Sequence, residues 1–252
     1  MTRITPAVPG RLAGAGHAIA WAARSIARPV TILGFVEMPR AGMEAATTVA
    51  SLPPLLTAPR GDGHPVLIVP GLSGGASLAT ALRLYLKALG YQVHTLGGSE
   101  SRGKLGNITA RLFKRIGDLA DEHGPVSLIG WSVGGVLTRQ AGLARAEQVR
   151  MVITLGTPSG GPWYGAVPDT ADRPMPVPTT SVFSRSDPWF DWRDCIQPES
   201  PDCEDVAIVS SHFGMATNAL AYHVIADRLA LLPGHWSAYR SPRHHLVEAA
   251  LR

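Results

Sequence analysis

From about residue 65 onward the chain alternates short apolar runs with segments of helical periodicity, and this alternation restricts the fold more than any other feature. Six runs read as strands, at 66–70, 92–96, 126–130, 151–155, 180–184 and 206–210. Helical patterns cover 76–89, 104–123, 134–144 and 216–232. Nearly continuous apolar strands are typical of a parallel sheet covered by helices on both faces. The sequence therefore predicts an α/β fold with a mostly parallel central sheet of about six strands.

Residues 1–60 differ from the rest of the chain. Two helices are predicted there, at 11–27 and 35–51, separated by Pro29 and closed by Pro53 and Pro54. A linker rich in proline and glycine follows at 58–65. We expect 1–60 to be an N-terminal helical extension that packs on the core and is a candidate cap, and 61–252 to form one α/β domain.

Composition excludes several classes of function. The net charge is +4, but the basic residues are scattered rather than clustered, so nucleic-acid binding is not expected. A membrane span would need about 20 unbroken apolar residues, and none is found, although peripheral membrane contact stays open. The segment around His17 superficially resembles a signal peptide, yet an amphipathic helix is the favoured interpretation. This favours a cytoplasmic location slightly and leaves the oligomeric state undetermined.

A candidate nucleophile follows the third predicted strand. Gly130, Ser132 and Gly134 form a G-x-S-x-G motif between a strand and a helix. In that context the pattern forces a serine onto a strained turn at the tip of a parallel sheet. A serine that attacks an acyl group also needs backbone donors for the oxyanion. The expected donors are the N–H groups of Val133 and of Leu72, the latter in the glycine-rich turn after the first strand.

The acid and the base are expected at the ends of later strands. Asp187 lies just beyond the fifth predicted strand and is the favoured acid, with Asp191 in the same loop as the alternative. Among the nine histidines, His212 follows the last strand and precedes a helix, as the order Ser, Asp, His requires. The expected catalytic residues are therefore Ser132, Asp187 and His212.

These motifs together resemble those of bacterial α/β-hydrolase-fold lipases and carboxylesterases. The resemblance covers roughly residues 65–232 and rests on five segments: Pro70-Gly71-Leu72, Gly130 to Gly135, Leu155-Gly156-Thr157-Pro158, Ser184 to Asp187 and Ser211 to Gly214. It implies an α/β-hydrolase catalytic domain at 61–252 that forms an acyl-enzyme and needs neither cofactor nor metal. The chain departs from the family at Ser159, where a histidine is usual, and at Pro70, where many lipases have His-Gly. Both departures leave the substrate class open.

Aromatic and cysteine residues mark the loops that would border the cleft. An apolar acyl pocket could be lined by Trp131, Trp163, Tyr164, Trp189 and Phe190, or these side chains could only pack the loops down. Cys195 and Cys203 could form a local disulfide or remain free thiols. The family's acid loop often contains such a bridge, so the resemblance favours the disulfide, which would in turn favour export.

The predicted function is hydrolysis of small-molecule or lipid carboxylic esters with an apolar acyl chain by a serine esterase or lipase. Two alternatives remain. An acyltransferase would use the same three residues with an alcohol or a thiol in place of water, and a hydrolase fold without activity would serve as a binding protein.

Overall fold

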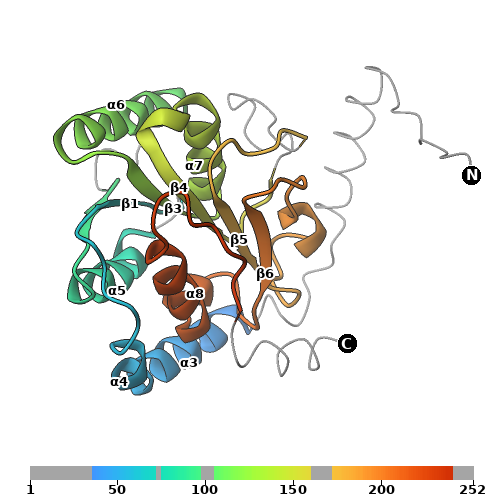
Figure 1. The fold of residues 1–252 in the computed structure, drawn as a ribbon. Helices are drawn as coiled ribbons and strands as arrows, with labels where there is room; N and C mark the ends of the chain where they lie inside the picture. Colours follow the sequence, from blue (N-terminus) through green and yellow to red (C-terminus); the bar gives the residue numbers. More distant parts are fainter. Residues whose placement is uncertain (1–35, 72–74, 98–104, 160–171, 241–252) are drawn as a thin grey trace, which may run out of the picture.

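Six parallel strands form the centre of the fold, in the order β2-β1-β3-β4-β5-β6 (Figure 1). They are seen in a computed structural model of the chain, which describes residues 36–71, 75–97, 105–159 and 172–240. Because every neighbouring pair is parallel, the carboxyl ends of all six strands lie at the same edge of the sheet. This confirms the predicted sheet. The strands are β1 (Pro65–Val69), β2 (Gln92–Thr95), β3 (Val126–Trp131), β4 (Val149–Leu155), β5 (Thr179–Phe183) and β6 (Cys203–Ala207).

The last strand begins earlier than its apolar residues indicate. It was predicted at 206–210, whereas β6 pairs with β5 from Cys203 to Ala207. Pairing is set here by backbone hydrogen bonds at the edge of the described sheet, where polar side chains such as Glu204 are tolerated. The Ile208 amide donates to the Phe183 carbonyl at 2.9 Å, and beyond it the chain leaves the sheet. Residues 208–213 therefore form a loop instead of a strand.

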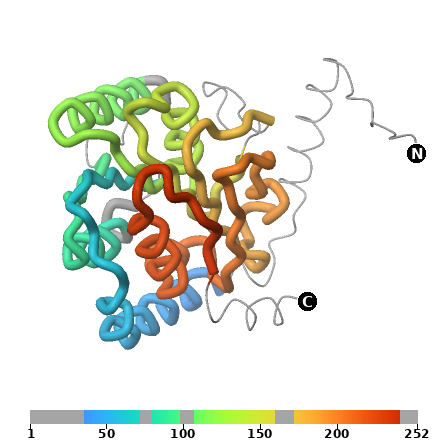
Figure 2. The backbone as a smooth tube through the Cα atoms, in the orientation of Figure 1, coloured from blue at the N-terminus to red at the C-terminus, as the bar shows by residue number. Residues whose placement is uncertain are grey.

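Helices cover both faces of the sheet, as the continuous apolar strands predict (Figures 1 and 2). Alternate residues of β1 point to opposite faces, so Val66 and Ile68 join one buried cluster and Leu67 and Val69 the other. The first cluster is completed by α5 (Gly75–Ala88) and α8 (Ala219–Leu229), and the second by α6 (Leu105–His123) and α7 (Val133–Ala144). The 3-10 helices within the described ranges are η1 (Ala146–Gln148), η3 (Trp192–Cys195) and η4 (Gly214–Thr217).

The N-terminal extension adds a helix on the α8 side of the sheet. The predicted helix at 35–51 is confirmed as α3 (Glu37–Ala50), which is followed by the short α4 (Leu52–Leu55). The predicted helix at 11–27 lies outside the described residues. In Figure 1, α3 runs beside α8, and it also contacts η4, the segment that follows the β6 loop. The extension thus reaches a loop at the carboxyl edge of the sheet.

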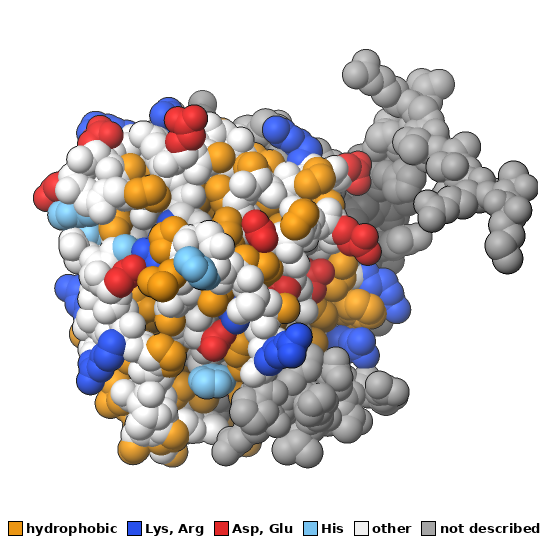
Figure 3. Space-filling view, viewed as in Figure 1, with side chains coloured by type: hydrophobic (Ala, Val, Ile, Leu, Met, Phe, Trp, Pro, Cys, Tyr) orange, Lys and Arg blue, Asp and Glu red, His pale blue; other side chains and the backbone are white. Residues whose placement is uncertain are grey.

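The surface is mixed in character. In Figure 3, the lysine and arginine side chains described on that face lie apart and are interspersed with acidic ones. None of the helices in the described ranges has the length and apolar character needed to cross a membrane.

Candidate active site

Ser132 lies at the turn between β3 and α7 and has a backbone conformation that is rare for a residue with a side chain. Its φ is 55°, and within the described part of the chain no other residue except glycine has a positive φ. Such a conformation costs on the order of 1–3 kcal/mol and persists only where neighbouring contacts enforce it. The Ser132 amide donates to the Leu155 carbonyl at 2.9 Å, and the Thr157 hydroxyl donates to the Ser132 carbonyl at 3.0 Å. These contacts hold Ser132 at the carboxyl end of β3.

Glycines around Ser132 allow α7 to approach the sheet closely. A Cβ atom on Gly130 would lie 2.4 Å from the Gly135 Cα, and one on Gly134 would lie 2.0 Å from the Val69 carbonyl oxygen. Both distances are well below the 3.0 Å that real Cβ contacts respect. The G-x-S-x-G spacing is therefore a packing requirement of the strand-turn-helix unit, as the sequence indicates.

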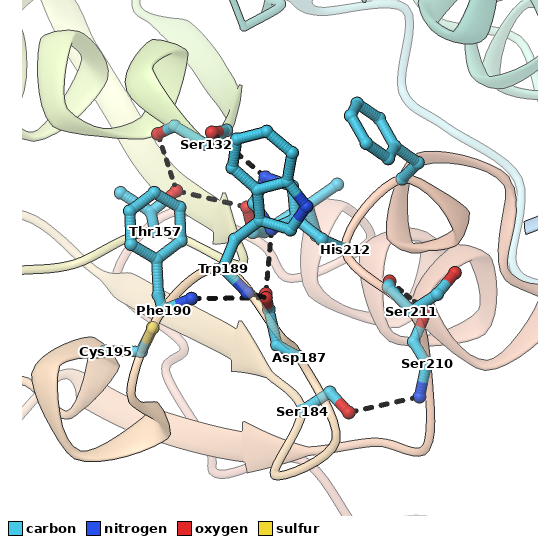
Figure 4. A network of polar contacts seen from close by, with 12 residues as sticks. Ser132, Thr157, Ser184, Asp187, Trp189, Phe190, Cys195, Ser210, Ser211 and His212 are labelled. Atoms are coloured by element: carbon cyan, nitrogen blue, oxygen red, sulfur yellow. Dashed lines mark hydrogen bonds and ion pairs between the residues drawn. The ribbon is translucent and has the colours of Figure 1, made fainter. Parts of the chain in front are cut away.

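His212 and Asp187 meet Ser132 at hydrogen-bonding distance (Figure 4). The His212 Nε2 lies 3.1 Å from the Ser132 Oγ, and the His212 Nδ1 lies 2.8 Å from the Asp187 Oδ2. Because an ionised carboxylate can only accept, Nδ1 carries the proton and Nε2 is left to accept the serine proton. All three side chains are buried. The three residues proposed from the sequence are thus brought together from β3, β5 and β6 in the geometry of a Ser-His-Asp triad.

The alternative acid, Asp191, has a different contact. The Oδ1 of Asp187 accepts from the amides of Trp189 at 2.7 Å and Phe190 at 3.3 Å, which fixes the carboxylate with its other oxygen toward His212. Asp191 instead caps η3, where its Oδ1 accepts from the Arg193 amide at 3.1 Å. The geometry therefore favours Asp187 as the partner of His212.

Aromatic rings surround the His212 imidazole. The centroid of the imidazole lies 5.2–5.7 Å from the ring centroids of Trp131, Trp189, Phe190 and Phe213. The Phe213 ring in turn lies 5.8 Å from Trp131 and 5.5 Å from Trp189. Trp131 also donates from its Nε1 to the His212 carbonyl at 3.1 Å. Trp131, Trp189 and Phe190 were expected near the site, whereas Phe213 was not, although its position directly after His212 was an available signal. Trp163 and Tyr164 lie outside the described residues.

One of the two expected oxyanion donors can be located. Val133 is the first residue of α7, so its amide is at the positive end of that helix. Leu72 lies outside the described residues, but Gly71 just before it approaches the nucleophile, since a Cβ there would lie 3.4 Å from the Ser132 Cβ. The glycine-rich turn after β1 therefore begins beside Ser132, where a second donor is needed.

The disulfide favoured by the resemblance is not formed. Cys195 and Cys203 are both free thiols. The Cys195 side chain packs with Phe183 and Phe190, whereas Cys203 packs against the α6 and α7 cluster, so the two sulfurs belong to different parts of the core. Burial raises the pKa of both thiols. They therefore remain protonated at neutral pH.

Polar residues of α3 that were not expected at the site reach the loops that carry the acid and the base. Glu37 and Glu44 bind the His212 loop, and Arg40 binds Ser186. Their spacing along one helix face was the available signal, but a charged face usually points to solvent. No group of three or more His, Cys, Asp or Glu side chains in the described residues is placed to hold a metal ion.

No protein-family model and no curated protein matches the chain in sequence. Solved structures match it in fold. Alpha/beta hydrolase domain-containing protein 10 from mouse aligns with a TM-score of 0.51 and 19% identity over 68% of this chain and 89% of its own. A structure from the metagenome-derived lipolytic enzymes LipS and LipT aligns with a TM-score of 0.50 and 16% identity over 68% and 93%. The esterase domain of a Rhodothermus marinus protein gives 0.50 and 15% over 69% and 88%. At such identities the likeness concerns architecture, and the chain has the α/β-hydrolase fold.

Proposed function

We propose that the protein is a serine carboxylester hydrolase of the esterase or lipase type, acting on esters with an apolar acyl chain. The observation that carries this proposal is the contact of a strained Ser132 with His212, whose second nitrogen is bound by Asp187. A structural serine would not need a positive φ together with a buried, carboxylate-oriented base. Lipolytic and esterase proteins among the fold neighbours support the same class.

In the proposed reaction the Ser132 Oγ attacks the ester carbonyl carbon while His212 Nε2 takes the hydroxyl proton. The amides of Val133 and Leu72 are the proposed donors to the oxyanion that forms. When the carbon–oxygen bond of the ester breaks, His212 returns the proton to the departing alcohol. Water then attacks the acyl-enzyme, giving its proton to His212, and the acid leaves as Ser132 is reprotonated. This chemistry needs no cofactor because backbone amides stabilise the charge.

The apolar acyl specificity is proposed from the aromatic surroundings of the base. Trp131, Trp189 and Phe190 border His212 in the structure, and Trp163 and Tyr164 are proposed to extend this lining. Trp189 is 54% exposed beside the reacting histidine, so it is available to contact an acyl chain. Each methylene of an acyl chain that is buried against these rings should stabilise the bound substrate by about 0.8 kcal/mol.

The test is hydrolysis of p-nitrophenyl esters of graded chain length by the wild type and by Ser132→Ala. We expect release by the wild type to be Ser132-dependent and to increase with chain length up to the pocket's limit, with a loss of about 10⁴-fold or more in the variant. A fluorophosphonate probe should label Ser132 in the same preparation. If no ester in the series is cleaved and Ser132 is not labelled, the proposal is wrong.

A further inference from the structure

The two backbone amides that flank His212 are both bound by carboxylates of a single helix. The Ser211 amide donates to the Glu44 Oε1 at 2.7 Å, and the Phe213 amide donates to the Glu37 Oε1 at 2.8 Å. Glu37 and Glu44 are seven residues apart in α3, which is about two helical turns and places them on the same face. The main chain of the proposed base is therefore held on both sides by one rigid element.

Glu44 holds this loop through its second oxygen as well. The Glu44 Oε2 accepts from the Ser210 hydroxyl and, at 2.9 Å, from the Asn218 side-chain amide. Ser210 and Asn218 lie on opposite sides of His212 in the chain, so one carboxylate joins the two ends of the loop. Charge-assisted hydrogen bonds of this kind are about twice as strong as neutral ones.

The same helix face binds the chain next to the proposed acid. Arg40 lies one turn after Glu37, and it donates from its two terminal nitrogens to the Ser186 carbonyl at 3.1 Å and to the Ser186 hydroxyl at 2.7 Å. Ser186 immediately precedes Asp187. The residues adjacent to both Asp187 and His212 are thus fixed by charged side chains from one stripe of α3.

We propose that α3 is the positioning element of the active site, with Glu37 and Glu44 as positioning residues for His212 and Arg40 as the positioning residue for Asp187. This inference rests on the proposed function. It assigns the N-terminal extension a role in aligning the base with the nucleophile, which is distinct from covering the cleft. Displacement of a reacting group by about 1 Å can cost on the order of 10²-fold in rate.

Burying the carboxyl group of Glu37 costs free energy that a neutral side chain at this position would not cost. Its side chain is buried, and among the described residues its Oε2 has no hydrogen-bond partner. Burial raises the pKa of Glu37, and the nearby Asp187 carboxylate raises it further, although the Phe213 amide, His212 and Arg40 act in the opposite direction. A glutamine of the same shape would accept the same Phe213 hydrogen bond without that cost. When it is ionised, the Glu37 carboxylate stabilises the imidazolium that forms on His212 during the reaction, which a glutamine would not do.

The variants Glu37→Gln, Glu44→Gln and Glu44→Ala test this role by two readouts, ester turnover and the second-order rate of Ser132 labelling by a fluorophosphonate. For Glu37→Gln we expect a fall in kcat of about threefold to tenfold with unchanged KM, because a neutral amide stabilises the His212 imidazolium less than the Glu37 carboxylate does. The acid limb of the pH profile should move to lower pH, because the variant loses the negative charge of Glu37 near His212. The Asp187 carboxylate and the Arg40 cation remain nearby. The variant should be at least as stable as the wild type at pH 8.

For Glu44→Ala we expect a fall of about 10²-fold in both turnover and labelling. Glu44→Gln keeps the side chain and should lie between this variant and the wild type, so it gives a result even if alanine prevents folding. The matched control is Thr47→Ala, on the solvent-facing side of the same helix, where the Thr47 hydroxyl donates to the Met43 carbonyl of α3 at 2.9 Å.

The outcomes separate the two proposals. Ser132-dependent esterase activity that is equal in the wild type, Glu37→Gln and Glu44→Gln would overturn the positioning role and leave the proposed function intact. A loss that tracks only thermal stability, and that Thr47→Ala reproduces, would also overturn it. A wild-type protein with neither esterase activity nor labelling of Ser132 would overturn the proposed function and this inference with it.

Discussion

At the residue scale, two aspartates four positions apart have different tasks because their carboxylates face different partners. Asp187 accepts from two loop amides with one oxygen and lies 2.8 Å from His212 Nδ1 with the other. Asp191 accepts from the Arg193 amide at the start of η3. The sequence left these two residues as candidates for the acid, and the direction in which each side chain points decides between them.

Replacing each aspartate by asparagine tests this assignment. Asp187→Asn keeps an acceptor for the Trp189 amide but presents an amide to His212, which favours the wrong tautomer, so kcat should fall by about 10⁴-fold. Asp191→Asn should leave kcat within about twofold, because asparagine caps a helix as well as aspartate does. Steady-state kinetics on a p-nitrophenyl ester checks both. Similar losses in the two variants would contradict the assignment of Asp187.

The cysteines show where a resemblance misleads at this scale. The expected pairing of Cys195 with Cys203 was taken from other acid loops and does not occur, since the two thiols pack into separate clusters. Spacing along the chain does not show into which part of the core each sulfur packs. Without the disulfide, the argument for export that depended on it also disappears.

At the element scale, the strand-turn-helix unit of β3 and α7 depends on close backbone approach. A Cβ on Gly134 would meet the carbonyl of Val69 at 2.0 Å, so the clash is with backbone and cannot be relieved by a side-chain rotation. We expect Gly134→Ala to lower the free energy of unfolding by at least about 3 kcal/mol. Differential scanning calorimetry should then show a clear fall in Tm, of the order of 6 °C or more.

A glycine elsewhere in a helix is the control for this prediction. Gly117 lies inside α6, and the nearest atom to an added Cβ there is the Gln148 Nε2 at 4.0 Å. Gly117→Ala should raise stability by about 0.5–1 kcal/mol, because alanine loses less entropy than glycine in a helix. If the two alanine variants changed Tm in the same direction, close approach of α7 would not be the determinant.

Elements buried on both faces were the most predictable part of the fold. The inner strands β1, β3, β4 and β5 lie within about two residues of their predicted positions, and their residues are buried almost throughout. The edge strand β2, which is only partly buried, also begins at its predicted residue. β6 was misplaced because an edge strand is set by pairing with its neighbour, which the polar residues Glu204 and Asp205 do not reveal. The order of Ser132, Asp187 and His212 likewise followed from strand ends, since parallel strands bring their carboxyl ends to one edge.

The orientation of α3 could not be predicted, because its buried face is polar rather than apolar. Its charged face points inward, and Met38 and Met43 are exposed at 61% and 72%. Amphipathic patterns normally predict the reverse. The inward face meets the backbone amides of Ser211 and Phe213, which must have acceptors when buried. Sequence patterns record apolar burial and do not record which loops leave polar backbone groups to be satisfied.

At the scale of the whole molecule, a second polar network lies at the opposite, amino-terminal edge of the sheet. His64 contacts Asp62 through Nδ1 and lies 2.8 Å from the Ser127 Oγ through Nε2. The order of atoms is that of a triad, but Ser127 is a fully buried strand residue without a glycine turn. Arg150 extends the network by binding Asp62 and the Leu231 carbonyl, each at 2.8 Å. This network ties the linker before β1 to β3, β4 and the chain after α8.

This network predicts how stability depends on pH. Burial lowers the pKa of His64, and the Arg150 charge lowers it further against the pull of Asp62, so the folded protein binds a proton there less readily than the unfolded chain. Stability should therefore fall as pH decreases below the ordinary value of 6.5, by up to about 1.4 kcal/mol per pH unit. Asp62 affects stability in a lower pH range. Burial raises its pKa, but hydrogen bonds from His64 and Arg150 outweigh this and hold the pKa well below 3.8.

Urea unfolding between pH 8 and pH 4.5 measures the first window, and His64→Gln isolates the residue. The variant should be less stable at pH 8, because it loses the contacts to Asp62 and Ser127, but its stability should decline less steeply as pH falls. Some slope should remain, since burial also lowers the pKa of His94. The exposed His235 serves as control, and His235→Gln should follow the wild-type curve. Parallel curves for His64→Gln and the wild type would mean that His64 takes up its proton equally in both states, and the network would then owe its stability to packing rather than to a neutral imidazole.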